Sequence, residues 1–173
     1  EVVSPTSLAV EFVAARAVFE SACALSAGIG APLLSGTTAL YHTDRAFVIE
    51  TLKRHGLRLA IENEVELTAG EMLEKIGDGG NGVIGTALDT GWYATHGYDP
   101  VQAIDELRQF IFHVHLKDVL PGDAHINCAY GKGSVPIEDC VKGLLKIGYD
   151  GVISIENHTL DHDPTEELVQ ARE

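Results

Sequence analysis

Residues 57–63 read Leu57-Arg58-Leu59-Ala60-Ile61-Glu62-Asn63, a short, mostly apolar run that ends in a carboxylate and an amide. A stretch with helical spacing of apolar side chains, about 45–54, comes before it, and Gly56 supplies a stop signal between the two. A polar loop begins directly after the run. A helix that ends at a glycine, followed by an apolar strand and a polar loop, is typical of one repeat of an α/β fold.

The same order of elements recurs along the chain. Strands are predicted at 31–34, 57–63, 83–89, 110–116 and 151–156, and residues 1–3 are the candidate tail of another strand. Helices are predicted at about 11–27, 45–54, 69–76 and 137–147, after Asp99-Pro100, and near Pro164. Strands that alternate with helices predict right-handed βαβ units and a parallel sheet. No linker divides the chain, so we expect residues 1–173 to form one domain.

Composition narrows the classes of partner. The chain has 173 residues, of which 45% are hydrophobic and 22% charged, as in an ordinary globular domain. Its net charge of −14 would repel a phosphate backbone, so no nucleic-acid partner is expected. No apolar run approaches the length of a membrane span and no signal peptide opens the chain, so no membrane partner is expected.

The cysteines indicate a reducing compartment. Cys23, Cys128 and Cys140 are odd in number and include no C-x-x-C pair. A disulfide framework is therefore not expected, and a cytoplasmic location is.

Four potential metal ligands stand at the carboxyl ends of predicted strands. They are Glu62, Asp89, His115 and Glu156, and each is followed by a polar loop. In a parallel barrel these ends share one rim, where active sites are built. Three carboxylates and one imidazole make an oxygen-rich ligand set, which favours Mn²⁺, Mg²⁺ or Co²⁺ over a thiolate-type zinc centre and leaves Zn²⁺ as the alternative.

Alternation along the strands adds candidates beside these ligands. His113 lies on the same strand face as His115 but deeper, and we interpret it as a hydrogen-bonded core histidine. Glu64 shares a face with Glu62, and His158 shares a face with Glu156. Glu64 and His158 are therefore candidates for contact with a substrate, with a solvated loop residue as the alternative for each.

Two glycine-rich stretches do not fit nucleotide-binding motifs. Residues 77–82 match G-x-G-x-x-G, but they follow a helix and precede a strand, the reverse of the dinucleotide-binding context, so we interpret them as a helix stop and loop. Gly131-Lys132-Gly133 lacks the spacing of a P-loop and is interpreted as a loop over the mouth of a barrel.

Several motifs together resemble the sugar phosphate isomerase/epimerase superfamily, the xylose isomerase-like TIM barrels. The matching segments are Leu59-Ala60-Ile61-Glu62-Asn63, Leu88-Asp89-Thr90-Gly91, His113-Val114-His115-Leu116-Lys117-Asp118, Gly131-Lys132-Gly133 and Gly148-Tyr149-Asp150-Gly151, followed by Ile155-Glu156. The resemblance implies a (β/α)8 barrel, of which this chain would supply about strands 4 to 8 without the N-terminal strands. It also implies that Glu62, Asp89, His115 and Glu156 hold the metal.

The resemblance further implies a metal-dependent sugar isomerase or epimerase in carbohydrate metabolism. A small sugar or polyol would lose the proton next to its carbonyl and pass through an enediolate. Glu62 and Glu156 would form the acid/base pair. Lys117 would stabilise oxygen charge at the mouth, or pair with Asp118 at the surface. The sequence leaves open whether the protein forms a homo-oligomer.

Two positions depart from the family pattern. Trp92 stands where many members have a substrate-contacting histidine three residues after the metal-binding Asp, and Pro121 stands where ketose 3-epimerases tend to have an arginine. Trp92 would form an apolar wall against a sugar ring, or be a packed loop aromatic, and His96 is expected to be an exposed loop residue. The alternatives are an inosose dehydratase-like lyase on the same scaffold, an endonuclease IV-like phosphodiesterase, which would need more histidine ligands and a basic groove, and a non-catalytic barrel fragment.

Overall fold

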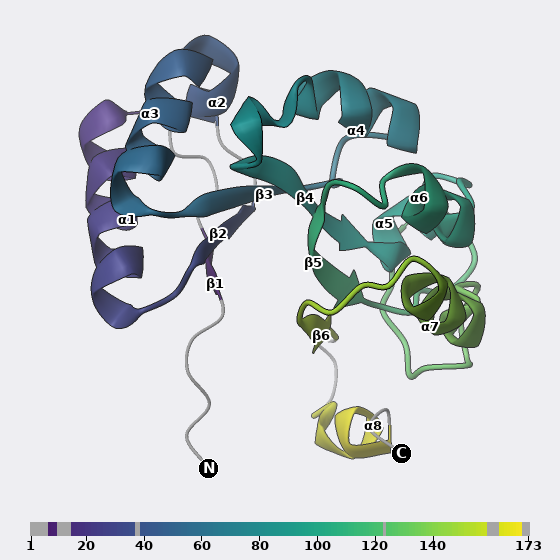
Figure 1. Ribbon diagram of the computed structural model, residues 1–173. Helices are drawn as coiled ribbons and strands as arrows, with labels where there is room; N and C mark the ends of the chain where they lie inside the picture. Colours follow the sequence, from purple (N-terminus) through teal and green to yellow (C-terminus); the bar gives the residue numbers. More distant parts are fainter. Residues whose placement is uncertain (1–6, 10–14, 37–38, 123, 159–162, 171–173) are drawn as a thin grey trace. The chain divides into compact units, whose positions relative to one another are not determined.

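The computed structural model describes residues 7–9, 15–36, 39–122, 124–158 and 163–170. The chain divides into two compact units (Figure 1). The first unit comprises residues 1–62 and 75–87, and the second comprises residues 63–74 and 88–173. Helix α4 (Ala69–Ile76) and strand β4 (Ile84–Asp89) each pass from one unit to the other along the chain.

The first unit is built on parallel strands. It contains β1 (Ser7–Ala9), β2 (Leu33–Gly36), β3 (Arg58–Glu62) and the first four residues of β4. Each strand pairs in parallel with the next one in the chain, and Leu59 lies level with both Leu34 and Ile84. These three side chains are fully buried, as expected for strands that are covered on both faces.

Helices α1 (Arg16–Ile29), α2 (Ala39–Thr43) and α3 (Arg45–His55) belong to the same unit. Helices α1 and α3 lie side by side (Figure 1). The rings of Phe19 and Phe47 meet edge to face with their centroids 6.4 Å apart. Helix α3 ends at Gly56, whose φ of +67° is the left-handed conformation that closes a helix. A short 3₁₀ helix, η1 (Gly79–Asn81), precedes β4.

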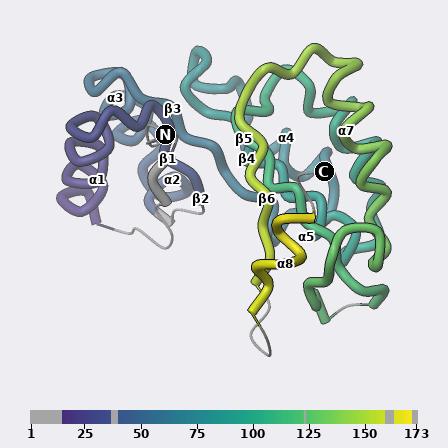
Figure 2. Tube along the Cα trace, turned by 90° about the horizontal axis from the view of Figure 1, so that it is seen from below, coloured from purple at the N-terminus to yellow at the C-terminus, as the bar shows by residue number. Residues whose placement is uncertain are grey.

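The second unit contains α5 (Thr90–Thr95), α6 (Pro100–Glu106), β5 (Ile111–Leu116), α7 (Ile137–Lys146), β6 (Ile153–Ile155) and α8 (Thr165–Gln170) (Figure 2). Strands β5 and β6 are parallel, with His115 level with Ser154. Helix α6 packs against α7, and α5 packs against both α6 and β5. The side chain of Asp99 caps α6, because its Oδ1 accepts a hydrogen bond from Val101 N at 2.8 Å.

The described elements confirm the five predicted strands, with boundaries that shift by up to two residues. They add β1, α2 and α5, which the sequence did not predict. The proposed strand tail at 1–3 and the start of the first helix at 11–14 lie outside the described residues. Within the described residues, no helix combines the length and the apolar character that a membrane span requires.

Candidate metal and substrate site

Asp89 is held by hydrogen bonds on its backbone and on one carboxylate oxygen. It ends β4 and caps α5, and its Oδ1 accepts from Gly91 N at 2.7 Å and from Trp92 N at 3.0 Å. The side-chain amide of Asn63 bonds both backbone groups of Asp89: Oδ1 accepts from Asp89 N at 2.7 Å, and Nδ2 donates to Asp89 O at 3.0 Å. Because Oδ1 serves the helix, Oδ2 is the atom that Asp89 presents to the cluster around it.

Lys117 brings a buried positive charge to that oxygen. Its side chain is 2% exposed, and its Nζ lies 2.9 Å from Asp89 Oδ2 and 3.2 Å from Glu156 Oε1. Burial lowers the pKa of Lys117, but the charges and hydrogen bonds of Asp89 and Glu156 outweigh it and raise the pKa overall. The predicted alternative of a surface ion pair with Asp118 is therefore wrong, because Lys117 points inward to two other carboxylates.

The stem of Lys117 reaches this place past a glycine. A Cβ on Gly91 would lie 2.9 Å from Cδ of Lys117. The lysine backbone is also fixed, since Lys117 N donates to Thr90 Oγ1 at 3.0 Å and Thr90 Oγ1 donates to Lys117 O at 2.8 Å. The Thr90-Gly91 pair after β4 thus positions the ammonium group.

Glu156 joins the cluster from the residue after β6. Its Oε2 lies 2.7 Å from His115 Nδ1, and its Oε1 lies 2.7 Å from His158 Nε2. Burial would raise the pKa of Glu156, but the hydrogen bond from His115 and the charges of Lys117, His115 and His158 lower it to about 2. The carboxylate is therefore ionised throughout the physiological pH range.

Three of the four predicted ligands converge within the second unit. Asp89, His115 and Glu156 each offer a ligand atom, and these atoms lie within 4.8 Å of one another. Carboxylate oxygen and imidazole nitrogen are ordinary donors to divalent ions, and a cation would offset the cost of burying the carboxylates, so the donor set fits a metal. Glu62 is the last residue of β3, level with Ala87 in the strand register, and belongs to the first unit.

Asp118 organises the loop that the Gly131-Lys132-Gly133 motif predicted. It is 1% exposed, and its Oδ2 accepts from Gly131 N at 2.9 Å and from Gly133 N at 3.0 Å, while its Oδ1 accepts from Val135 N at 3.1 Å. A Cβ on Gly133 would lie 2.2 Å from Asp118 Oδ1, so only glycine fits there. Sequence reasoning missed this role, although the Lys117-Asp118 pair was part of the quoted motif.

Trp92 lies among imidazoles. Its ring stacks on His125 with centroids 3.5 Å apart and an interplanar angle of 8°, and on His96 at 5.7 Å and 19°. His96 is half-buried, and its Nε2 lies 3.2 Å from Glu64 O, so the expectation of an exposed loop histidine is wrong. Sequence reasoning missed His125, because it stands in a loop with no periodic pattern to indicate its neighbours.

His113, His158 and Glu64, which the sequence singled out, differ in their burial and contacts. His113 is 2% exposed with its Nε2 2.9 Å from Ser154 Oγ, which confirms a hydrogen-bonded core histidine. His158 is 69% exposed on its side chain and meets the cluster through Glu156. Glu64 is half-buried in the loop after β3, and the contact that places it is through its backbone oxygen.

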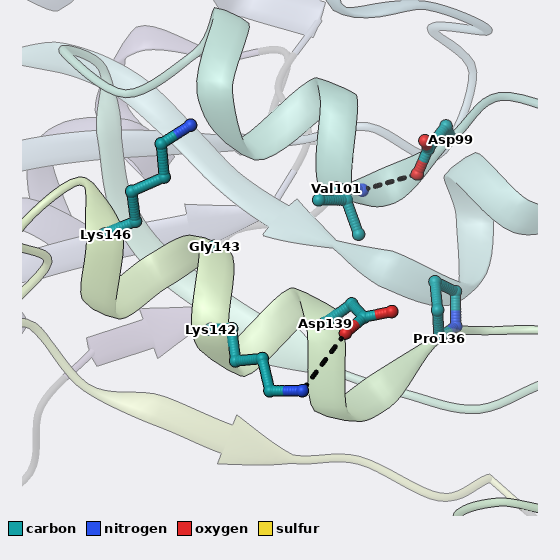
Figure 3. A pocket seen from close by; sticks show the side chains of 7 residues that line it. All are labelled: Asp99, Val101, Pro136, Asp139, Lys142, Gly143 and Lys146. Carbon is teal, nitrogen blue, oxygen red and sulfur yellow. Dashed lines mark hydrogen bonds and ion pairs between the residues drawn. The ribbon is translucent and has the colours of Figure 1, made fainter.

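A separate hollow of about 450 Å³ lies between α6 and α7 (Figure 3). Its lining consists of Asp99, Val101, Pro136, Asp139, Lys142, Gly143 and Lys146. It includes none of the predicted site residues. Lys142 is engaged there by Asp139 and by the neighbouring Glu138, at 3.4 and 2.8 Å. The hollow is thus distinct from the carboxylate cluster.

Residues 14–173 match the family described as the xylose isomerase-like TIM barrel. The chain belongs to this family. Its parallel βα units, which the strand pattern predicted, are accordingly part of a TIM barrel, as the resemblance of its motifs implied. The match begins before α1 and runs through β6 and α8, so it includes every candidate site residue.

Proteins similar to this chain match different shares of its length and of their own. An uncharacterized protein of Methanocaldococcus jannaschii, MJ1311, is 29% identical over 123 residues, which are 65% of this chain and 41% of that protein. A solved structure of L-ribulose 3-epimerase superimposes with a TM-score of 0.72 and 20% identity, over 95% of this chain and 66% of that one. A structure of the IOLI protein with a binding zinc atom gives a TM-score of 0.72 and 15% identity, over 98% and 74%. The two structural likenesses show the fold.

Proposed function

We propose that the chain is part of a divalent-metal-dependent sugar isomerase, either an epimerase or an aldose–ketose isomerase. The observation that carries the proposal is the convergence of the buried Asp89 with the half-buried His115 and Glu156, whose ligand atoms lie within 4.8 Å of one another in a xylose isomerase-like barrel. The expected substrate is a small sugar or polyol that loses the proton next to its carbonyl and passes through an enediolate.

Asp89, His115, Glu156 and Glu62 would hold the ion. Asp89 would offer Oδ2, because its Oδ1 caps α5. A bound divalent ion supplies Lewis-acid stabilisation of oxygen charge on the substrate. The oxygen-rich donors suit Mn²⁺, Mg²⁺ or Co²⁺, and the zinc atom named for the IOLI structure keeps Zn²⁺ as the alternative for this chain.

Glu62 is proposed as the fourth ligand on its place in the chain. It ends β3, as Asp89 ends β4, and the two strands are parallel neighbours. The next residue, Asn63, bonds both backbone groups of Asp89 at 2.7 and 3.0 Å. Because Glu62 directly precedes Asn63, we propose that it binds the same metal ion as Asp89.

The acid/base work would fall to Glu156 and Glu62. Glu156 has its pKa lowered to about 2 by His115, Lys117 and His158 against the opposing effect of burial, so it is ionised and carries no proton of its own at neutral pH. His158 is largely exposed and 2.7 Å from Glu156 Oε1, which gives a proton that Glu156 accepts a route to solvent. Glu62 would return a proton on the other side. Contacts to the substrate are proposed for Glu64, Trp92, Lys117 and His158.

The test measures bound metal and the exchange of substrate C–H protons into heavy water by the full-length protein. The panel comprises ketohexoses, ketopentoses, inososes and small hydroxycarbonyls, each with Mn²⁺ and with chelator. Glu156→Gln should lower exchange by roughly 100- to 10,000-fold, the range for losing an acid/base group. The matched control is Glu138→Gln, a surface carboxylate that is 84% exposed and should leave exchange unchanged.

The outcomes separate the rival functions. Exchange that survives in Glu156→Gln would remove that residue from the acid/base role. A product that has lost water would indicate the dehydratase-like lyase, which shares the first proton abstraction. Bound metal without exchange on any substrate would favour the phosphodiesterase or the non-catalytic fragment, and absence of bound metal would refute the proposed centre.

A further inference from the structure

Lys117 contacts two of the carboxylates that are proposed to bind the metal ion. Its Nζ lies 2.9 Å from Asp89 Oδ2 and 3.2 Å from Glu156 Oε1, and its side chain is 2% exposed. Two carboxylates from different strand ends therefore share one ammonium group. A buried carboxylate needs a partner, and this lysine supplies one to Asp89.

The two carboxylates make further contacts beside those to Lys117. Oδ1 of Asp89 accepts two backbone N–H bonds at the start of α5. Oε2 of Glu156 lies 2.7 Å from His115 Nδ1, and Oε1 lies 2.7 Å from His158 Nε2. An ion that binds Asp89 must therefore use Oδ2, the atom that the ammonium contacts.

The metal ion and the ammonium group of Lys117 would compete for the same carboxylate oxygen, Oδ2 of Asp89. A divalent ion sits about 2.0–2.2 Å from a carboxylate oxygen, closer than the ammonium, and two cations at such a short range repel each other. Neighbouring residues position the lysine. Gly91 leaves room for its stem, and Thr90 bonds its backbone N and O at 3.0 and 2.8 Å.

Resting on the proposed metal centre, we propose that Lys117 is a built-in cation that joins Asp89 to Glu156 and that an entering divalent ion displaces. Two consequences follow. The donors bind a metal ion more weakly than they would without the lysine, so the ion is exchangeable. The displaced ammonium becomes free of its two carboxylates only when the ion is in place.

The first experiment measures the affinity of the full-length protein for Mn²⁺ alone by calorimetry, with no sugar present. Lys117→Met keeps an unbranched stem of similar length and removes the charge, and it should bind Mn²⁺ at least tenfold more tightly. Lys142→Met is the matched control, because Lys142 also contacts two carboxylates but is 62% exposed and should leave the affinity unchanged.

The second experiment needs no variant and therefore survives if Lys117→Met does not fold. Acetylation of lysines in the wild-type protein is followed by peptide mass spectrometry with and without Mn²⁺. Lys117 should be labelled at least threefold faster with Mn²⁺, and Lys142 at the same rate in both conditions.

The failures can be told apart. Equal or weaker Mn²⁺ binding by Lys117→Met, or unchanged or slower labelling of Lys117, would overturn the displacement while leaving the metal centre in place. Tight binding by the variant when wild type binds weakly supports it most directly. No Mn²⁺ binding by either protein would remove the proposed centre, and with it this inference.

Discussion

The imidazole of His125 stacks face to face on the indole of Trp92, with ring centroids 3.5 Å apart and planes only 8° from parallel. A second contact to the same helix, α5, holds the position, since His125 Nδ1 lies 2.8 Å from Thr95 Oγ1. The backbone of His125 has a φ of +48°, a left-handed conformation that a histidine adopts only at some cost. Packing against α5 therefore fixes a loop residue to the site.

This stack predicts an optical titration. Burial, with the charge of Lys117 as a further cause, lowers the pKa of His125 from 6.5 to about 4. A protonated imidazole in contact quenches indole emission, so the emission of Trp92 should fall as pH drops through about 4 and stay level near 6.5. The measurement is the emission of wild type minus that of Trp92→Phe. His125→Asn, which tolerates a positive φ, should abolish the transition, and a midpoint near 6.5 would contradict the burial of this ring.

The same pKa predicts a pH dependence of stability. The folded chain holds His125 neutral down to about pH 4, whereas the unfolded chain protonates it near 6.5. Between these values the unfolded state binds more protons, so this contribution to stability is complete above 6.5 and is lost as pH falls towards 4. Urea unfolding at pH 7.0 and 4.5 should show wild type losing about 1–2 kcal/mol more than His125→Asn, the value being discounted for partial exposure. Equal losses in both proteins would contradict the prediction.

Gly133 is predicted to be intolerant of any side chain. A Cβ there would lie 2.2 Å from Asp118 Oδ1 and 2.3 Å from Val119 O, so the loop must move and release its bonds to Asp118. Gly133→Ala should cost about 2 kcal/mol or more, as a buried carboxylate loses partners. Gly28→Ala is the control: it lies in α1 with nothing within 4 Å of the added Cβ, and should be neutral or stabilising by up to about 1 kcal/mol. Denaturant unfolding of both variants decides the matter, and a loss at Gly133 below that at Gly28 would refute the close approach.

How far the sequence predicts this fold depends on the periodicity of each element. Strands β2 to β6 are short apolar runs bounded by glycines and polar loops, so their places could be predicted. Helix α5 could not, because it has only six residues and depends on the Asp89 side chain for its cap, a residue that the pattern had marked as a ligand. Local pattern also gave no sign of the three-residue strand β1.

The site residues at strand ends could likewise be predicted from the sequence, whereas those in loops could not. Strand ends align residues that are far apart in sequence, so Asp89, His115 and Glu156 could be placed together without coordinates. Their roles as ligands, and those of Glu62 and the substrate contacts, stay predictions. The contacts around the site, such as those of Asn63 with the backbone of Asp89 and of His125 with Trp92, come from loops whose conformations depend on tertiary contacts.

The three cysteines are free thiols, as their number and spacing predicted, and they should differ in reactivity. Cys23 and Cys140 are fully buried, and burial raises their pKa to about 11 and about 12. Cys128 is half-buried, with its pKa raised to about 11 by burial and by Asp118. At pH 8 a thiol of pKa 11 has roughly a hundredfold less thiolate than one of pKa 9, so labelling of the native protein should be slow and confined to Cys128. Peptide mapping after maleimide treatment should find label on Cys128 in the native protein, on neither of the two remaining cysteines in native Cys128→Ser, and on all three cysteines of the wild type in urea. Rapid native labelling of Cys23 or Cys140 would mean that the helices carrying them, α1 and α7, open far more often than their packing implies.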